Sequence, residues 1–568
     1  MPISGATLGR RRWLLWLSRA CVVLFALALN WHVGHRGLFL FDQSMVFDGG
    51  WRVLQGQVPY RDFYMPFGPV TFWLQGAVFW LCGATFSSMV LSATLANGIA
   101  TACAMRLSQL LFPGLWWTEF IAGVATAIWF QPPFGTLWME QCAFLLGLLS
   151  ILAVLQGGRA TGRWRTVLFG IGGTALLGAL LSKQNAGGLL GFVLAGLILV
   201  DALPHWRAVI RNIMSWTAGI LVAATAFVAW LLLFSDPVAF RKYFFEIALA
   251  LGRERVDGVV NIARTLSFHS APYDAYLVSL FVFFVGSGLL GLTLWKLRFE
   301  QAWVRSVRTS AYLAVGLTFC QNLFAFLTEN EPANCYPYAG VCLALVGAAA
   351  FTAVGRLRFT VEVGGEKPAP IRLPKWSVVA ITSLLALATS AMAMRDAWRR
   401  VVQQFDRDTT FTEKLRLSNA SLFWGQPTWV AGPGGPRLRK EDFEAVYRHL
   451  KARGKRFFVF GDSTILYGLT GQNSPQPLLY FLEGQTFRES DIAWLDPLIV
   501  RSLARNHVEL LVIETASYMD IHATCRRFSH LAQWMKTGFT PTATYGNYEI
   551  WEADGGEEAH ADDQAAKR

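Results

Sequence analysis

Apolar residues recur along the first 394 positions in stretches long enough to cross a lipid bilayer. One crossing takes about 17 to 25 predominantly apolar residues. Twelve stretches approach this length, over residues 13–33, 68–84, 87–107, 115–131, 137–155, 166–182, 186–203, 213–234, 273–295, 309–327, 337–355 and 376–394. The pattern predicts a mostly α-helical protein, built as a polytopic bundle of transmembrane helices.

Basic residues between these stretches predict how the chain is threaded through the membrane. Lys and Arg collect in four connecting loops, which alternate with loops poor in net positive charge. Cytoplasmic loops carry an excess of Lys and Arg. We therefore expect these four loops on the cytoplasmic side, at residues 159–165, 205–211, 296–308 and 356–375.

One early stretch must fail to span if the arginines at 10–12 are also cytoplasmic. The stretch 68–84 is the best candidate, because it is short, begins Gly68-Pro69 and contains Gln75. Such a segment suits a helix that lies in the outer interface or re-enters the bilayer. We therefore expect about 11 spans plus an interfacial helix in a bacterial inner membrane, with the N-terminus cytoplasmic.

After residue 394 the apolar stretches end and short alternating elements follow. Helical periodicity over 441–453, 497–506 and 524–537 alternates with strand patterns over 456–460, 509–514 and a strand pair at 542–552. We expect a transmembrane catalytic domain over 1–394 and a small extracytoplasmic α/β domain over 395–553. Residues 554–568 lack large apolar side chains, which predicts a disordered tail.

Composition agrees with a membrane protein and excludes several other classes. The chain is 54% hydrophobic and only 15% charged, against roughly 25% charged in soluble globular proteins. Its net charge of +12 does not require a nucleic-acid partner, because the basic residues lie mostly in the short loops that set orientation. The eight cysteines show neither metal-ligand spacing nor a disulfide framework.

Polar and acidic groups gather in the loops that this topology places outside. The first external loop, 34–67, contains Asp42, Asp48, Arg61 and Asp62 together with several glycines. A carboxylate at the membrane edge can act as a general base, and an arginine beside it can hold a phosphate. The alternative is an ordinary solvated connector, although this density of charge and glycine is unusual for one.

At this loop the sequence resembles the GT-C superfamily of integral-membrane glycosyltransferases, particularly the protein mannosyltransferases and the aminoarabinose transferases of lipid A. Members place a catalytic acid in the first external loop and follow it with a run like GQVPYRD at 56–62. The resemblance implies that Asp42 is the catalytic acid. In the same loop, Arg61 is a candidate to bind the donor phosphate and Asp62 a candidate to contact substrate.

The resemblance extends to polar groups of the later external loops. Lys183 and Gln184 lie between two apolar stretches, where an ammonium at headgroup level suits the phosphate of a polyprenyl carrier. Arg253 and Arg255 are further phosphate-binding candidates. The candidates for acceptor or sugar contacts are Glu140, Gln184, Glu331 and Tyr336.

Each of these residues also has a simpler interpretation. Glu140 begins an apolar stretch, where the helix macrodipole alone favours an acid. Lys183 is also compatible with a side chain that reaches the interface from a helix end. The basic residues of 235–272 are explained about as well by an amphipathic interfacial helix.

These observations favour an enzyme that transfers a sugar from a polyprenyl-phosphate donor to a lipid or polysaccharide acceptor on the outer face of the membrane. Its expected partners are the lipid-linked sugar, the acceptor and membrane lipids. No cofactor is identified, and a divalent cation is compatible with the resemblance without being implied by it.

Three other functions remain open from sequence. One alternative is a flippase or exporter for a lipid-linked glycan, although such proteins place charges near the bilayer midplane and show paired repeats, and no repeat is evident here. Another is a non-catalytic envelope assembly protein. Gly461-Asp462-Ser463 also matches the start of GDSL-type esterase motifs, although a strand entering a polar turn explains it equally.

Overall fold

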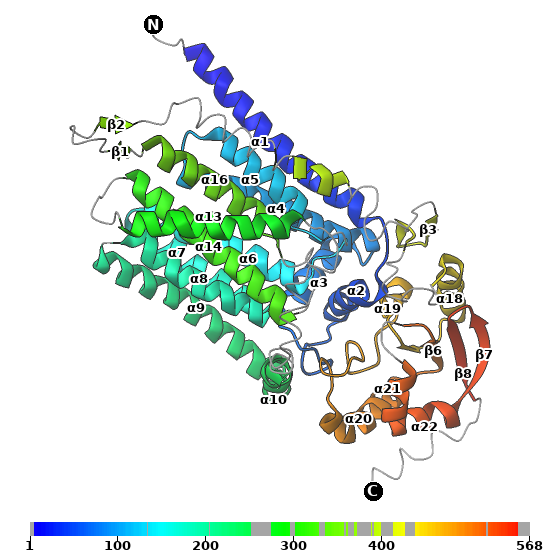
Figure 1. Ribbon diagram of the computed structural model, residues 1–568. Coiled ribbons are helices and arrows are strands. Elements are labelled where there is room, and N and C mark those ends of the chain that lie inside the picture. The colour runs from blue at the N-terminus through cyan, green and yellow to red at the C-terminus, as the bar shows by residue number, and fades with distance from the viewer. Residues whose placement is uncertain are drawn as a thin grey trace.

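The computed structural model describes residues 5–132, 135–203, 205–250, 274–295, 302–328, 336–356, 359–361, 369–371, 388, 391–392, 394–398, 413–425, 438–517 and 521–554. Long helices form one bundle, and a small sheet with short helices lies beyond one end of it (Figure 1). The N-terminus lies at the opposite end of the bundle. The helices up to residue 356 are α1 (Gly5–Gly34), α2 (Leu40–Leu54), α3 (Val70–Cys82), α4 (Phe86–Leu111), α5 (Trp116–Trp129), α6 (Met139–Arg159), α7 (Gly162–Leu180), α8 (Gln184–Ala202), α9 (Trp206–Phe234), α10 (Pro237–Phe240), a π-helix (Arg241–Ile247), α13 (Asp274–Trp295), α14 (Ala302–Thr328) and α16 (Ala339–Arg356).

Six of the described helices are long and apolar enough to cross a membrane, namely α1 from Trp13 on, α4, α6, α8, α9 and α16. The sequence predicted about 11 spans. Four more of the predicted spans form the helices α5, α7, α13 and α14, which pack in the same bundle. α5 is short, with 14 residues, and α7 begins with arginines, whereas α13 and α14 have 22 and 27 residues. The remaining predicted span, 376–394, lies almost entirely outside the described residues.

The segment predicted not to span forms the short apolar helix α3. With 13 residues, it is about 20 Å long, which is less than the thickness of a bilayer's hydrocarbon core. It packs between α2 and α4. The prediction that 68–84 does not cross the membrane agrees with this length.

Helix α2 lies in what the sequence suggested was an external loop. Two glycines allow α2 to pack closely on α3. A Cβ at Gly49 would lie 2.3 Å from the ring of Phe72, and one at Gly50 would lie 2.5 Å from Gln75. The missing side chains therefore let α2 approach α3 closely. Apolar packing against α3 and the C-terminal region outweighs the low helix propensity of two consecutive glycines.

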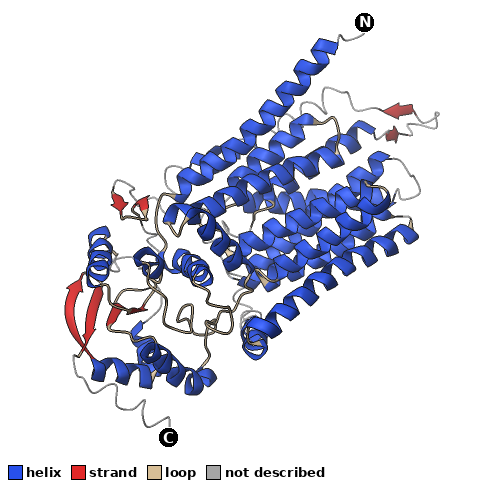
Figure 2. Ribbon diagram, turned by 180° about the vertical axis from the view of Figure 1, so that it is seen from behind, coloured by secondary structure: helices blue, strands red, loops and turns tan. Residues whose placement is uncertain are grey.

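The C-terminal region contains a four-stranded sheet in the order β5-β6-β8-β7. β5 and β6 are parallel, and the other two pairs are antiparallel. Figure 2 shows helices on the side of this sheet that faces the bundle. The elements are α18 (Lys440–Arg453), β5 (Phe457–Phe460), α19 (Ile465–Thr470), a 3-10 turn (Glu489–Asp491), α20 (Ile492–Arg505), β6 (Leu510–Glu514), α21 (Ile521–Arg527), α22 (Ser529–Gly538), β7 (Phe539–Tyr545) and β8 (Tyr548–Ala553).

The predicted fold class is confirmed as a helical membrane bundle with a small C-terminal α/β region. Two short hairpins accompany them, formed by β1 (Phe359–Val361) with β2 (Ala369–Ile371) and by β3 (Lys414–Arg416) with β4 (Ser421–Phe423). The domain boundary at 394/395 stays a prediction, because most residues around it are outside those described. The predicted tail also lies outside them, apart from residue 554.

The C-terminal region shares a hydrophobic core with the bundle. Phe41 of α2 and Phe67 belong to the same buried cluster as Phe458, Tyr480 and Leu495. Main-chain hydrogen bonds add to this contact: the amide of Tyr64 donates to the carbonyl of Pro477 at 2.7 Å, and Leu479 donates back at 3.3 Å. The two parts are therefore packed as one body at this junction.

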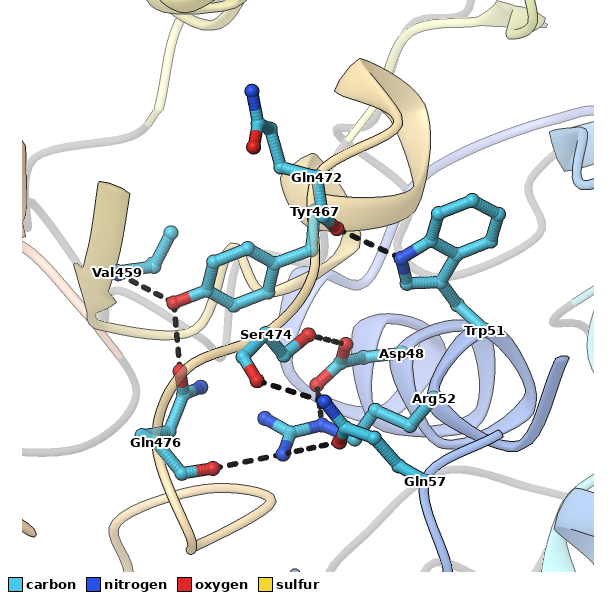
Figure 3. A network of polar contacts seen from close by, with 9 residues as sticks. All are labelled: Asp48, Trp51, Arg52, Gln57, Val459, Tyr467, Gln472, Ser474 and Gln476. Atoms are coloured by element: carbon cyan, nitrogen blue, oxygen red, sulfur yellow. Dashed lines mark hydrogen bonds and ion pairs between the residues drawn. The ribbon is translucent and has the colours of Figure 1, made fainter. Parts of the chain in front are cut away.

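A fully buried ion pair lies at the same junction (Figure 3). Arg52 Nε contacts Asp48 Oδ2 at 2.8 Å, and both side chains have an exposed fraction of 0%. Asp48 also accepts a hydrogen bond from Ser474 Oγ, and Arg52 Nη1 donates to the carbonyl of Gln476 at 2.8 Å. Helix α2 is thus held directly to the segment that follows α19.

Removing one partner of this pair should destabilise the protein strongly. Arg52→Met leaves the Asp48 carboxyl buried without its cation, and such a loss costs about 3–5 kcal/mol. We expect a clearly lower melting temperature for the purified protein in detergent.

The matched control is Arg448→Met, which breaks the exposed ion pair of α18 with Glu444, also spaced four residues apart. An exposed pair of this kind contributes about 0.3–0.5 kcal/mol. Equal melting temperatures for the two variants would contradict a special role for the buried pair.

Candidate active site

Asp42 lies in the first turn of α2 and is partly buried under the C-terminal region. Its surroundings raise its pKa to about 8, first because burial disfavours the charged carboxylate and then because the negative charge of Glu140 is near. Asp462 adds to this effect, whereas the ammonium of Lys183 opposes it. Asp42 is therefore a carboxyl whose proton equilibrium lies close to neutral pH.

Glu140 and Lys183 meet beside Asp42. Glu140 is in the first turn of α6, and Lys183 is the residue that precedes α8. Lys183 Nζ lies 2.9 Å from Glu140 Oε1. Three residues predicted separately, from three helix starts, thus form one charged cluster.

Phe67 lies against the Lys183 side of this cluster, with its ring centre 4.6 Å from Lys183 Nζ. The loop reaches this place because Gly68 packs onto the end of α7, where a Cβ would lie only 1.8 Å from the carbonyl oxygen of Leu181. Gln184 Nε2 donates to the carbonyl of Pro66 at 2.9 Å and to that of Phe244 at 3.0 Å. Gln184, predicted to contact substrate, therefore supports the loop around Phe67.

The GQVPYRD run forms a tight turn that holds the same loop. Tyr60 has φ 67°, a left-handed conformation that is unusual for a residue other than glycine. Its hydroxyl donates to the carbonyl of Phe67, and its ring is fully buried. Asp62 Oδ2 accepts a hydrogen bond from the amide of Val58 at 2.7 Å. In the structure this motif shapes the wall of the cluster.

The C-terminal region supplies two further residues to the site. The ring of Tyr480 packs edge-on against Phe41 at 5.2 Å and lies nearly parallel to Phe67 at 6.4 Å. Asp462, at the end of β5, is close enough to influence the charge of Asp42. Sequence reasoning noticed Asp462 within the Gly-Asp-Ser motif but not its proximity to Asp42. No local signal indicated Tyr480.

The Gly-Asp-Ser turn itself is built for structure and not for an esterase. Glu514 Oε2, at the end of β6, accepts bonds from the amide of Asp462 at 2.9 Å, the amide of Ser463 at 3.1 Å and Ser463 Oγ at 2.9 Å. Burial raises the pKa of the Glu514 carboxyl. Ser463 is fully buried and also bonds to the hydroxyl of Tyr548. A buried serine held in this way does not fit the role of a nucleophile.

Other predicted site residues make contacts of their own. Arg61 and Asp62 form an exposed ion pair with each other at 2.8 Å, and Arg61 also reaches the carbonyl of Phe234. Tyr336 is buried at the start of the turn before α16 and donates to Asn322 Oδ1 at 3.1 Å. Their proposed roles stay predictions. Arg253, Arg255 and Glu331 lie outside the described residues.

Within the ranges that the structure describes, no group of three or more His, Cys, Asp or Glu side chains is arranged to hold a metal ion.

Two solved structures match nearly the whole chain. One is ArnT, an aminoarabinose transferase from Cupriavidus metallidurans bound to undecaprenyl phosphate, with TM-score 0.53 and 11% identity over 95% of this chain and 98% of that chain. The apo form of that protein gives TM-score 0.53 and 13% identity over 96% and 98%. The arabinosyltransferase EmbB from Mycobacterium smegmatis has 12% identity over 67% of this chain and 37% of that chain, with a TM-score of 0.36, too low to establish a shared fold.

Sequence comparison adds nothing to these matches. No family model matches the chain, and no curated protein matches it in sequence. At 11–13% identity the two ArnT structures establish the fold. The chain therefore has the architecture of the membrane aminoarabinose transferase ArnT, which is the fold that the resemblance to the GT-C superfamily implied.

Proposed function

We propose that the protein is a membrane glycosyltransferase that moves a sugar from a polyprenyl-phosphate donor to an acceptor hydroxyl. The observation that carries this proposal is the cluster of Asp42, Glu140 and Lys183. It combines a carboxyl suited to proton transfer with a cation suited to phosphate. The ArnT fold supports this assignment.

In the proposed reaction, Asp42 takes the proton of the acceptor hydroxyl as its oxygen attacks the anomeric carbon of the sugar. The new bond joins that carbon to the acceptor oxygen, and the bond that breaks joins it to the donor phosphate. The polyprenyl phosphate leaves with both electrons of that bond. Lys183 is placed to stabilise the negative charge that grows on the leaving phosphate.

Two features support a lipid-linked donor. The cluster lies at the N-terminal ends of the apolar helices α6 and α8. A phosphate bound there would lie near the headgroup level of the bilayer. In addition, the ArnT structure of the same fold contains undecaprenyl phosphate. We propose Arg61, Arg253 and Arg255 as further phosphate contacts.

The remaining predicted contacts belong to the same proposal. Glu140, Asp62, Gln184, Glu331 and Tyr336 are proposed to bind or position the sugar or the acceptor. We further propose that the cluster and the domain over 395–553 lie outside the cytoplasm. The support is the excess of Lys and Arg in the loops at the other end of the bundle.

The direct test incubates the purified protein with a panel of polyprenyl-phosphate sugars and measures the release of polyprenyl phosphate. Release that depends on an acceptor supports the proposal. If the lipid-linked substrate crosses a vesicle membrane without losing its sugar, the flippase alternative is correct instead.

Replacing the proposed base should remove turnover without removing binding. Asp42→Asn keeps the size and most hydrogen bonds of the side chain but loses the proton acceptor, so we expect a fall of about 100-fold or more in kcat. Donor binding, measured by retention of a labelled lipid, should persist. As a control, Glu246→Gln changes an exposed carboxylate at the same end of the bundle, and its kcat should stay unchanged.

Lys183→Ala should behave differently from Asp42→Asn. A cation that contacts the phosphate before and during the reaction contributes to ground-state and transition-state binding alike. We therefore expect weaker donor binding together with lower kcat/KM. Normal donor affinity in this variant would remove Lys183 from the phosphate site.

The pH profile should report the state of Asp42. A general base must be deprotonated, and the pKa of Asp42 is raised to about 8, so kcat/KM should rise with pH and level off above that value. Glu140→Gln removes a negative neighbour, lowers the pKa of Asp42 and shifts the rise to lower pH. A profile that is identical in wild type and Glu140→Gln would contradict the assignment of the base.

A further inference from the structure

A second charged cluster lies at the end of the bundle away from Asp42. Helix α6 connects the two, because Glu140 is in its first turn and Arg159 in its last. The helix has 21 residues, so its ends are about 30 Å apart. Five arginines form this cluster: Arg159, Arg165, Arg305 and Arg308 lie within electrostatic range of the carboxylate of Asp201, and Arg211 lies within range of Arg165.

Asp201, near the end of α8, is bonded to the first part of α14. Arg305 Nη2 lies 2.6 Å from Asp201 Oδ2, and Thr309 Oγ1 donates to Oδ1 at 3.1 Å. Helix α6 also approaches this carboxylate closely, since a Cβ at Gly158 would lie 2.8 Å from Oδ2. Three helices therefore meet at one carboxylate.

Only Arg305 of the five arginines forms an ion pair within the described residues. Arg159 donates to the carbonyl of Leu155, and Arg165 donates to Asn212 Oδ1 at 2.9 Å. The arginines also lie within electrostatic range of one another: Arg305 acts on Arg159, and Arg211 acts on Arg165. The cluster thus holds much more positive than negative charge.

Arg308 is the most buried of the five, with an exposed fraction of 4%. Its Nη2 donates to the carbonyl of Leu203 at 3.0 Å, but its Nε is buried with no hydrogen-bond partner among the described residues. Burying a guanidinium is costly unless it is paired and its donors are satisfied. A buried guanidinium with an unsatisfied N–H donor favours the binding of an anion beside it.

Two exposed tryptophans mark the depth of the cluster. Trp164 and Trp206 begin α7 and α9, and 60% and 61% of their surfaces are exposed. Tryptophan is enriched where a membrane protein meets the lipid headgroups. Arg165 follows Trp164 directly, and Arg211 is just over one turn after Trp206. Arg165 and Arg211 are therefore expected at the height of lipid phosphates.

We propose that this arginine cluster binds the phosphate of an anionic phospholipid headgroup. Guanidinium groups match phosphate oxygens in geometry and charge, and basic pockets between transmembrane helices are suited to such headgroups. The proposal is independent of the proposed glycosyltransferase activity, because it concerns the opposite end of the bundle.

The orientation of the protein does not by itself explain the cluster. An excess of basic loop residues is enough to fix topology, and exposed arginines spread over separate loops would serve equally. Here Arg308 is buried within α14, Arg305 of the same helix pairs with Asp201, and Arg159 and Arg165 approach that carboxylate from α6 and α7. Convergence and burial of like charges are the features that call for a bound anion.

The test measures phospholipids retained by the purified full-length protein in native mass spectrometry, with added phosphatidylglycerol or phosphatidylcholine. Wild type should retain the anionic lipid preferentially. The double variant Arg165→Gln/Arg211→Gln should lower this retention roughly tenfold or more, since each basic residue adds to the attraction of an anionic lipid. Arg211→Gln, which disturbs no described side-chain contact of its own, should show a smaller loss in the same direction.

The matched control is Arg207→Gln, an exposed arginine one turn earlier in α9 and outside the cluster. It should retain phosphatidylglycerol as the wild type does. Equal retention of the two lipids by wild type, or undiminished phosphatidylglycerol on the double variant, would overturn the proposal. Displacement of the lipid by millimolar inorganic phosphate would also overturn it, in favour of a soluble anion.

Discussion

The buried pair of Asp48 and Arg52 is the interaction on which the candidate site depends. Helix α2 carries Asp42 at its start and this ion pair one to three turns later. Through Ser474 and Gln476 the pair is bonded to the segment that continues to Tyr480. The position of the proposed base relative to the C-terminal region is therefore set by groups that cannot be left unpaired without a large loss of stability.

Three helices begin at the candidate site. Asp42 and Glu140 lie in the first turns of α2 and α6, and Lys183 directly precedes α8. Helix starts carry partial positive charge and favour anions. This arrangement compensates in part for placing two carboxylates together, and it also suits a phosphate. The same backbone geometry thus supports both halves of the proposed reaction.

Sequence patterns predicted the apolar helices and the strands of the C-terminal sheet. They also singled out Asp42, Glu140 and Lys183, each separately, as candidate site residues, because each has a local signal. They did not predict α2, since its two glycines lower helix propensity and its stability comes from close packing on α3. Nor did they predict that Tyr480 and Asp462 lie beside Asp42. That proximity depends on tertiary contacts across more than 400 residues, for which a single sequence holds no periodic signal.

The core shared by the bundle and the C-terminal region has a consequence for how substrates reach Asp42. Lifting the region away would expose Phe41, Phe67 and Tyr480 among other side chains. At about 25 cal/mol per Å² and 150–250 Å² for each aromatic side chain, the cost would be about 4–6 kcal/mol for every ring exposed. The C-terminal region is therefore expected to stay packed on the bundle and not to open as a hinged lid. Under the proposed function, the reactants would therefore have to reach Asp42 with the C-terminal region in place.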